Sequence, residues 1–158
     1  MSLPDVAELL CCSNFSFLRG ASHPDELVAR AKAMGYTALA LTDECSMAGI
    51  AQAQVAAKRA KLPLIVGSQF RVQGPADTGD FTLVLLATRL NGYGNLCEFI
   101  TRLRRASEKG RYHLTLAGVD PAALAHCIAI AVPPRHATPA QTGATARWLL
   151  GTFLGRSE

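Results

Sequence analysis

The chain of 158 residues has few aromatic side chains, 6% of the total, and no long apolar run. A membrane helix needs about 20 consecutive apolar residues, and no stretch of this sequence approaches that length. The N-terminus also lacks the basic-then-apolar pattern of an export signal. We therefore expect a cytoplasmic protein with no membrane partner.

Paired cysteines and recognisable catalytic motifs are missing as well. The five cysteines show no Cys-x-x-Cys spacing, and their odd number and apolar neighbours predict reduced thiols in an intracellular protein. No glycine-rich phosphate loop and no Ser-His-Asp order is present. These absences exclude a disulfide scaffold and give no support to a nucleotide-binding loop or a serine-type hydrolase.

Charge is only mildly unbalanced, with a formal net charge of +4. An ordinary solvated surface is the simpler interpretation of such an excess. The densest basic cluster consists of Arg102, Arg104, Arg105, Lys109 and Arg111. Glu98 and Glu108 interrupt this cluster, so a solvated helix face competes with a surface that docks nucleic acid or another domain.

What the sequence does contain is a regular alternation of strand and helix patterns. Strands are expected over residues 38–42, 64–72, 81–87 and 127–132, after an opening strand that runs into a turn within residues 8–16. Helices are expected over residues 22–35, 49–61, 96–110 and 146–153, with Ser22 as a cap and a short helical turn at 120–125. This order predicts an α/β fold of about five mainly parallel strands with flanking helices. No linker is visible, so residues 1–158 are expected to form a single domain.

Polar residues follow three of these strands, where the carboxyl ends of parallel strands gather at one edge of a sheet. Residues 10 and 12 are expected to share a strand face, yet they are Leu10 and Cys12. Asp43 and Glu44 are the one carboxylate pair at these ends, and Gln69 is expected at the polar tip that ends the next aliphatic run. An acid/base pair is the functional interpretation of Asp43 and Glu44, and a loop or capping role is favoured over it.

Two further groups have a functional and a structural interpretation. Cys11, Cys12 and Cys45 are candidates for a soft-metal site, but consecutive strand residues face opposite sides, and buried thiols are favoured. His23 precedes a proline at a helix start, where a surface or capping role is favoured over a metal-binding one.

Several motifs are similar to those of a known family. The segment Glu8-Leu-x-x-x-Ser-Asn-Phe-Ser-Phe-Leu-x-Gly-Ala-Ser-His-Pro-x-Glu-Leu resembles the first motif of PHP (polymerase and histidinol phosphatase) domains. Gly35-Tyr-x-Ala-Leu-Ala-Leu-Thr-Asp-Glu-Cys and Leu64-Ile-Val-Gly-Ser resemble the second and third motifs, and residues 83–97 resemble the stretch that follows. The similarity covers about residues 7–112 and is strongest to the N-terminal PHP domain of bacterial error-prone DNA polymerase III alpha subunits.

The resemblance implies a distorted (β/α)7-type barrel, here a partial one, whose family members bind up to three metal ions in a ring of His, Asp and Glu. Position by position, that ring falls on Leu10, Cys12, Asp43, Glu44, Gln69 and Thr82. The aspartate of the second motif is present as Asp43, whereas most of the other ligands of the ring are missing. A leucine offers no donor atom, and neutral glutamine and threonine are poor replacements for carboxylate or imidazole.

The resemblance therefore implies a metal-free, catalytically silent PHP domain that needs no cofactor in this segment and has a structural or docking role. Its partners would be the rest of a polymerase chain, DNA through that full-length protein, and other replication or mutagenesis proteins. The full-length parent would be a translesion DNA polymerase that uses Mg in another domain. One alternative is a phosphoesterase or 3′-5′ exonuclease that uses Zn or Mn at Cys12, His23, Asp43 and Glu44. Another is a free-standing truncated binding protein.

Overall fold

The computed structural model describes residues 5–154. In chain order the elements are β1 (Ala7–Glu8), α1 (Pro24–Ala33), β2 (Ala38–Leu41), α2 (Ile50–Ala60), β3 (Leu64–Val72), β4 (Phe81–Ala87), α3 (Leu90–Arg105), a short 3₁₀ turn (Leu116–Gly118), β5 (Cys127–Val132) and α4 (Pro139–Phe153). This order confirms the predicted α/β alternation. The chain divides into two compact units, Met1–Ser68 and Gln69–Glu158. No helix within the described range is both long and apolar enough to cross a membrane.

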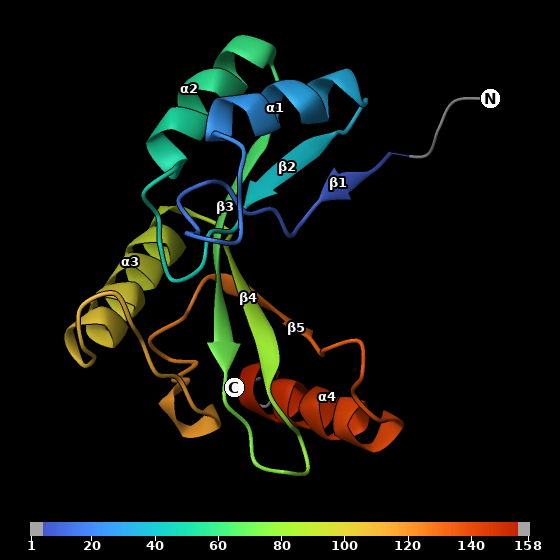
Figure 1. Ribbon diagram of the computed structural model, residues 1–158, viewed down its shortest axis with the longest axis vertical. Coiled ribbons are helices and arrows are strands. Elements are labelled where there is room, and N and C mark those ends of the chain that lie inside the picture. The colour runs from blue at the N-terminus through green and yellow to red at the C-terminus, as the bar shows by residue number, and fades with distance from the viewer. Residues whose placement is uncertain (1–4, 155–158) are drawn as a thin grey trace. The chain divides into compact units, whose positions relative to one another are not determined.

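The first unit is a small parallel sheet covered by two helices. β1 pairs with β2 through Ala7 and Ala38, and β2 pairs with β3 through Leu39 and Leu64, both in parallel register as predicted. Helices α1 and α2 lie side by side (Figure 1). The core between helices and sheet consists of Val28, Ala31, Leu39, Leu41, Ala53, Ala57 and Leu62. Its alanines are small, which lets the two helices approach the sheet and each other closely.

The opening strand is much shorter than the sequence predicts. β1 ends at Glu8, so Leu10 and Cys12 are not on a common strand face, and that prediction is wrong. The physical reason lies in Thr42, whose backbone N–H donates to the Cys11 carbonyl at 2.8 Å and whose Oγ1 accepts from the Cys11 N–H at 3.0 Å. A side chain therefore takes the place of a backbone partner, and the regular ladder does not continue past Glu8.

The N-cap of helix α1 lies one residue later than the sequence predicts. This cap is His23 rather than Ser22, and the His23 N–H donates to Glu26 Oε2 at 2.8 Å. Pro24 lies at the start of the first turn of the helix, and Asp25 and Glu26 lie beside the positive end of the helix dipole.

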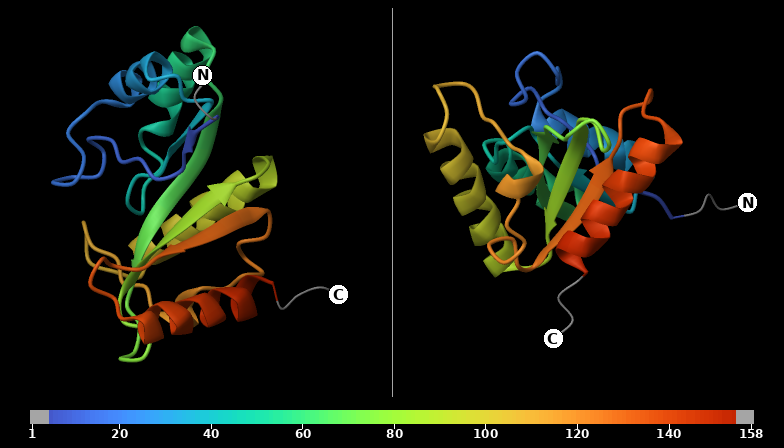
Figure 2. Two further views of the ribbon diagram at one scale, coloured as in Figure 1. Left: turned by 90° about the vertical axis from the view of Figure 1, so that its right-hand side faces the viewer. Right: turned by 90° about the horizontal axis from the view of Figure 1, so that it is seen from below.

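The second unit is built on an antiparallel strand pair. β4 and β5 pair from Thr82 with Val132 to Ala87 with Cys127. The prediction of a mainly parallel sheet is wrong for this pair. Helices α3 and α4 lie on opposite sides of the two strands (Figure 2). This double cover explains why β4 is apolar along nearly its whole length, because both of its faces are buried.

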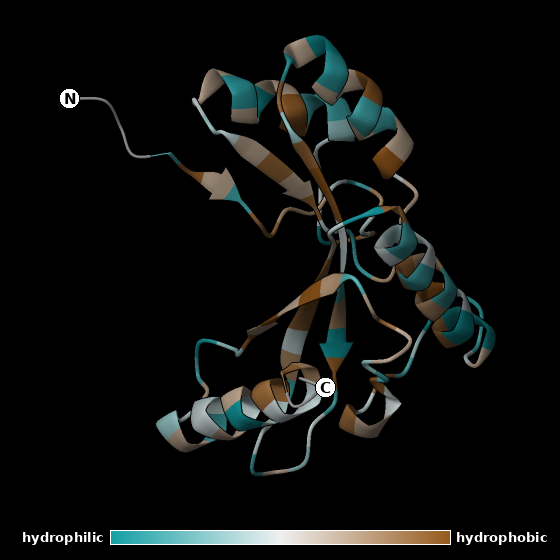
Figure 3. Ribbon diagram, turned by 180° about the vertical axis from the view of Figure 1, so that it is seen from behind, coloured by the Kyte–Doolittle hydropathy of each residue, from teal (hydrophilic) through white to brown (hydrophobic). Residues whose placement is uncertain are grey.

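Aromatic contacts hold each helix to the strands of the second unit. Phe70 on β3 meets Phe99 on α3 edge-to-face, with ring centroids 5.2 Å apart. Phe81 on β4 meets Trp148 on α4, with centroids 5.3 Å apart. The hydropathy colouring shows apolar residues along β4 and a polar end on α3 (Figure 3). Helix α3 ends at Arg105 rather than near residue 110 as predicted.

Candidate functional site

The retained carboxylate, Asp43, is buried in the first unit and is fully engaged by hydroxyl and amide donors. Only 2% of the surface of this residue is exposed to solvent. The Ser13 N–H and the Ser16 hydroxyl both donate to Oδ1 at 2.7 Å, and the Ser13 hydroxyl donates to Oδ2 at 2.7 Å. Hydrogen bonds of this length to a carboxylate are strong. Asp43 therefore fastens the turn that begins at Ser13.

Further hydroxyl groups extend this network along the backbone that follows β2. The Glu44 N–H donates to Ser16 Oγ at 2.9 Å, and the Ser68 hydroxyl donates to the Asp43 carbonyl at 2.7 Å. The Ser46 N–H in turn donates to Ser68 Oγ at 3.2 Å. We call Ser13, Ser16, Asp43 and Ser68 the Asp43 network. All four residues are buried, so their mutual hydrogen bonds replace those that water would otherwise supply.

The loop after Ser16 is held from outside by an ion pair. Arg19 Nη1 donates to Glu44 Oε2, and the two side chains are partly exposed. Leu18 at the tip of this loop has a positive φ of 62°. Glu44, the second candidate carboxylate, thus stabilises the loop in this structure, as Asp43 does.

The thiols beside this network are uncharged at neutral pH. Burial, helped by nearby Glu8, raises the pKa of Cys11 to about 11. Burial also raises the pKa of Cys12, although hydrogen bonding from Ser16 and the charge of Arg19 oppose the rise. A thiol must ionise to bind a metal or act as a nucleophile. These environments favour the interpretation of both cysteines as small hydrophobes, although the structure leaves them partly exposed and not fully buried.

His23 lies at the start of α1, on the surface. Its Nδ1 is 3.0 Å from Asn14 Nδ2, in a contact that closes the turn. Asn14 Oδ1 is buried and has no partner within the described part of the chain. His23 therefore has a structural role, because its contact with Asn14 stabilises the turn.

The donor set of the first unit does not fit a metal ion. Leu10 has no donor atom and is 40% exposed, and both oxygens of Asp43 already accept hydrogen bonds. Within residues 5–154, no three His, Cys, Asp or Glu side chains are placed to share an ion. We therefore derive no chemical step through a metal at these positions.

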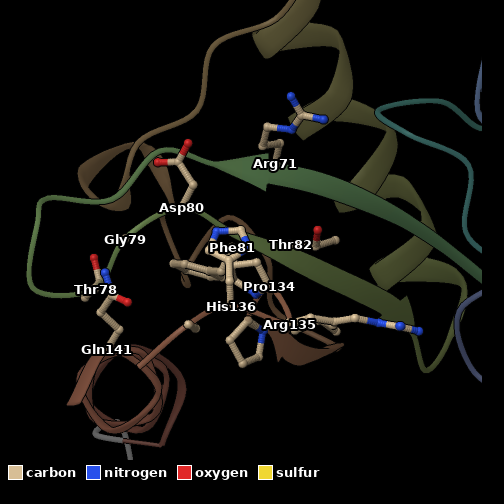
Figure 4. A pocket seen from close by; sticks show the side chains of 13 residues that line it. Arg71, Thr78, Gly79, Asp80, Phe81, Thr82, Pro134, Arg135, His136 and Gln141 are labelled. Carbon is tan, nitrogen blue, oxygen red and sulfur yellow. The ribbon is translucent and has the colours of Figure 1, made fainter. Parts of the chain in front are cut away.

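The last two ring positions belong to the second unit. Gln69 is buried in the middle of β3, so the expectation that it lies at a polar tip is wrong. Thr82 lines a cavity of about 680 Å³ beside the start of β4, together with Arg71, Asp80, Arg135 and His136 among others. The Arg71 and Arg135 guanidinium groups do not point toward one another (Figure 4). The cavity therefore does not present converging cationic groups to a ligand.

Sequence reasoning missed the serines that surround Asp43. Ser13 and Ser16 were available as a signal, because a pair of hydroxyls three residues apart stands in a mainly apolar stretch. Their partner lies 30 and 27 residues away along the chain, so the pairing itself is a tertiary fact.

Comparisons with known proteins agree with this architecture. The model of the PHP domain family matches residues 8–131. Among solved structures, a protein described as a metal-dependent phosphoesterase from Bifidobacterium adolescentis has a TM-score of 0.53 at 21% identity, over 66% of this chain and 35% of that one. At this identity the likeness shows the fold alone. An amidohydrolase from Chromobacterium violaceum also has a TM-score of 0.53, at 28% identity over 63% of this chain and 34% of its own.

Curated relatives are far longer than this chain. An error-prone DNA polymerase of Bordetella parapertussis is 49% identical over 98% of the chain, which spans 16% of that relative. An error-prone DNA polymerase of Methylococcus capsulatus is 52% identical over 95% of the chain, and the chain covers 14% of that relative. The family match, the strand and helix order and the motifs around Ser13, Asp43 and Gly67 all lead to one assignment: the chain belongs to the PHP domain family.

Proposed function

We propose that this chain is the N-terminal PHP domain of an error-prone DNA polymerase and that it performs no phosphoester chemistry of its own. The polymerase assignment is supported by relatives of about 50% identity that are error-prone DNA polymerases. On this proposal the whole protein would extend DNA past damage in the cytoplasm, with Mg bound in another domain. The PHP domain would brace the polymerase and dock its partners.

The proposal of catalytic silence depends chiefly on one observation, the hydrogen bonding of Asp43. Both of its oxygens accept bonds from Ser13 and Ser16, so coordination of a metal would compete with bonds that hold the loop. Leu10 supplies no ligand at the neighbouring ring position. Without a metal, no water is activated for attack on a phosphoester.

We further propose that residues 1–158 act as one PHP domain, although the chain forms two compact units. The family match over residues 8–131 extends across both units, which supports this assignment. Within the domain the Asp43 network would then have a purely structural task, to fix the loop over residues 13–20.

The test of catalytic silence is hydrolysis of p-nitrophenyl phosphate and of a 3′-labelled oligonucleotide by the purified chain, with Mn or Zn added. We expect no turnover above the level given by an Asp43→Asn variant of matched purity. Metal-dependent turnover that disappears in this variant would contradict the proposal. The polymerase assignment is tested separately, by reading the gene downstream of codon 158 for an open frame that encodes a polymerase.

A further inference from the structure

The positive charge of this chain is concentrated in one short segment. Residues 102–111 contain five of the 16 Lys and Arg residues and one of the 12 Asp and Glu residues. The remaining residues carry eleven of each kind and are neutral, so the formal net charge of +4 resides in this segment alone. A surface whose whole charge excess lies in ten residues has a strongly localised positive potential.

The cations of this segment point into solvent. Arg102, Arg105, Lys109 and Arg111 are exposed, and we call these four residues the α3 basic surface. None of them pairs with a carboxylate within residues 5–154, where the ion pair is that of Arg19 with Glu44. The last turn of α3 is accordingly polar in Figure 3. These four charges are available to an external anion.

The fifth cation, Arg104, has a different task. Its guanidinium lies 5.5 Å from the centroid of the Tyr112 ring, and its Nη1 donates to the Arg111 carbonyl at 3.5 Å. The Tyr112 hydroxyl accepts from the Arg71 N–H at 2.7 Å, and its ring meets Phe70 edge-to-face. The segment that follows α3 is thereby fixed to the core of the second unit. Such preorganisation reduces the entropy lost when a partner binds.

The helix dipole explains only part of this cluster. Cations in a last turn interact favourably with the dipole, and α2 uses Lys58 and Arg59 in that way. Lys109 and Arg111 lie beyond the end of α3 at Arg105, outside the reach of this effect. Arg102 and Arg105 are three residues apart and repel each other. A partner of opposite charge accounts for the full set better than stabilisation of the helix does.

We propose that the α3 basic surface docks the phosphate backbone of duplex DNA. Tyr112 is the one Phe, Tyr or Trp residue in the segment from 102 to 113, and its ring and hydroxyl are engaged within the protein. The segment therefore offers no free Phe, Tyr or Trp ring on which unpaired bases can stack. Cations without base-reading or stacking groups bind phosphates regardless of sequence. This inference deepens the proposed function and relies on it for the biological presence of DNA.

The experiment compares two variants of equal net charge. In the first, Arg102, Arg105, Lys109 and Arg111 are each replaced by Gln, and Arg104 is left in place to hold Tyr112. In the control, four exposed cations at the ends of α1 and α2 are replaced by Gln, namely Arg30, Lys32, Lys58 and Arg59. Both variants have a formal net charge of zero, so they differ only in where the charge is lost.

Binding is measured by fluorescence anisotropy with two labelled 24-bp duplexes of unrelated sequence, at several salt concentrations. We expect equal affinity for both duplexes and a slope of log K against log salt of about −3 to −4, since four neutralised phosphates give about −0.9 each. The first variant should bind at least about tenfold more weakly at low salt, and the control should stay within threefold of the original chain.

Equal losses in both variants would overturn the inference, and so would an original chain that does not bind either duplex at 20 mM salt. Circular dichroism melts of both variants ensure that neither has lost its fold. Failure of this test with an open polymerase frame downstream would refute the docking surface alone. A frame that does not continue into a polymerase would refute the proposed function, whatever the duplexes show.

Discussion

Replacement of Asp43 by Ala should reveal how much of the first unit depends on the Asp43 network. The change leaves three buried donors without an acceptor, namely the Ser13 N–H and the Ser13 and Ser16 hydroxyls. A hydrogen bond to a charged group contributes about 1.5–3 kcal/mol. Because the three bonds share one carboxylate, their contributions overlap, and we expect a total loss of about 3–5 kcal/mol.

Asp43→Asn is the matched control, since the amide keeps the shape and one acceptor oxygen. The Ser13 hydroxyl can rotate to accept from the new NH₂ group, so every bond is kept in a neutral form. We expect this variant to lose only about 1–2 kcal/mol, the difference between charged and neutral bonds. The losses are measured by urea denaturation followed by far-ultraviolet circular dichroism, in buffer with a chelator.

The chelator separates the structural role of Asp43 from a metal-binding one. If Asp43 were chiefly a metal ligand, its removal from metal-free protein would relieve an unpaired charge and cost little. An Asp43→Ala variant whose free energy of unfolding stays within about 0.5 kcal/mol of the original would therefore refute the structural role.

Three other outcomes follow from the described geometry. Stability should fall as pH rises from about 9 to 11, because the pKa of Cys11 is raised to about 11 in the folded chain and the unfolded thiol ionises first. A pKa shift of this size at a half-buried site corresponds to about 1 kcal/mol after allowance for solvent screening. A Cys11→Ala variant melted over the same pH range should lack that part of the decline. Gly20→Ala should destabilise the chain by several kcal/mol or prevent folding, since the new Cβ would lie 2.0 Å from the Ser13 carbonyl oxygen. Gly94→Ala should instead leave thermal stability unchanged or raise it by up to about 1 kcal/mol, since nothing lies within 4 Å of its Cβ position in α3. A Gly20 variant as stable as the Gly94 variant would contradict the close packing of the loop around Gly20.

The sequence predicts best those elements that a single strong pattern defines. The predominantly apolar runs predicted the bounds of β3, β4 and β5 as the structure has them. The PHP motifs also identified the family, which the match over residues 8–131 confirms. Both successes depend on local patterns, namely predominantly apolar runs and short motifs of fixed spacing.

The failures concern contacts between distant residues. Leu9 to Cys12 has the apolar character of a strand, but Thr42 binds the Cys11 backbone through its side chain and interrupts the ladder. The antiparallel direction of β5 depends on the path of the chain after α3, which no periodicity encodes. Gln69 lies inside β3 because the apolar run continues through Phe70 and Val72 beyond a polar interruption.

That the ring positions lack suitable ligands stays a prediction from residue type, and the hydrogen bonds of Asp43 could not be predicted at all. Leu10 and Thr82 could be identified as poor ligands from residue type alone. The role of Asp43 depends on Ser13 and Ser16, whose side chains meet it only after the loop has folded back. A buried carboxylate at a ligand position of the family can bind a metal or stabilise a loop, and its hydrogen-bond partners determine which role it has.

Metal content is the most direct test of the central claim that the ring positions no longer hold catalytic ions. The chain is purified without chelator, incubated with Zn or Mn, desalted and measured by elemental analysis against the protein concentration. We predict well below one ion per chain and no change of melting temperature on addition of either metal. Two or more tightly held ions per chain, lost on replacement of Asp43 by Asn, would contradict the claim.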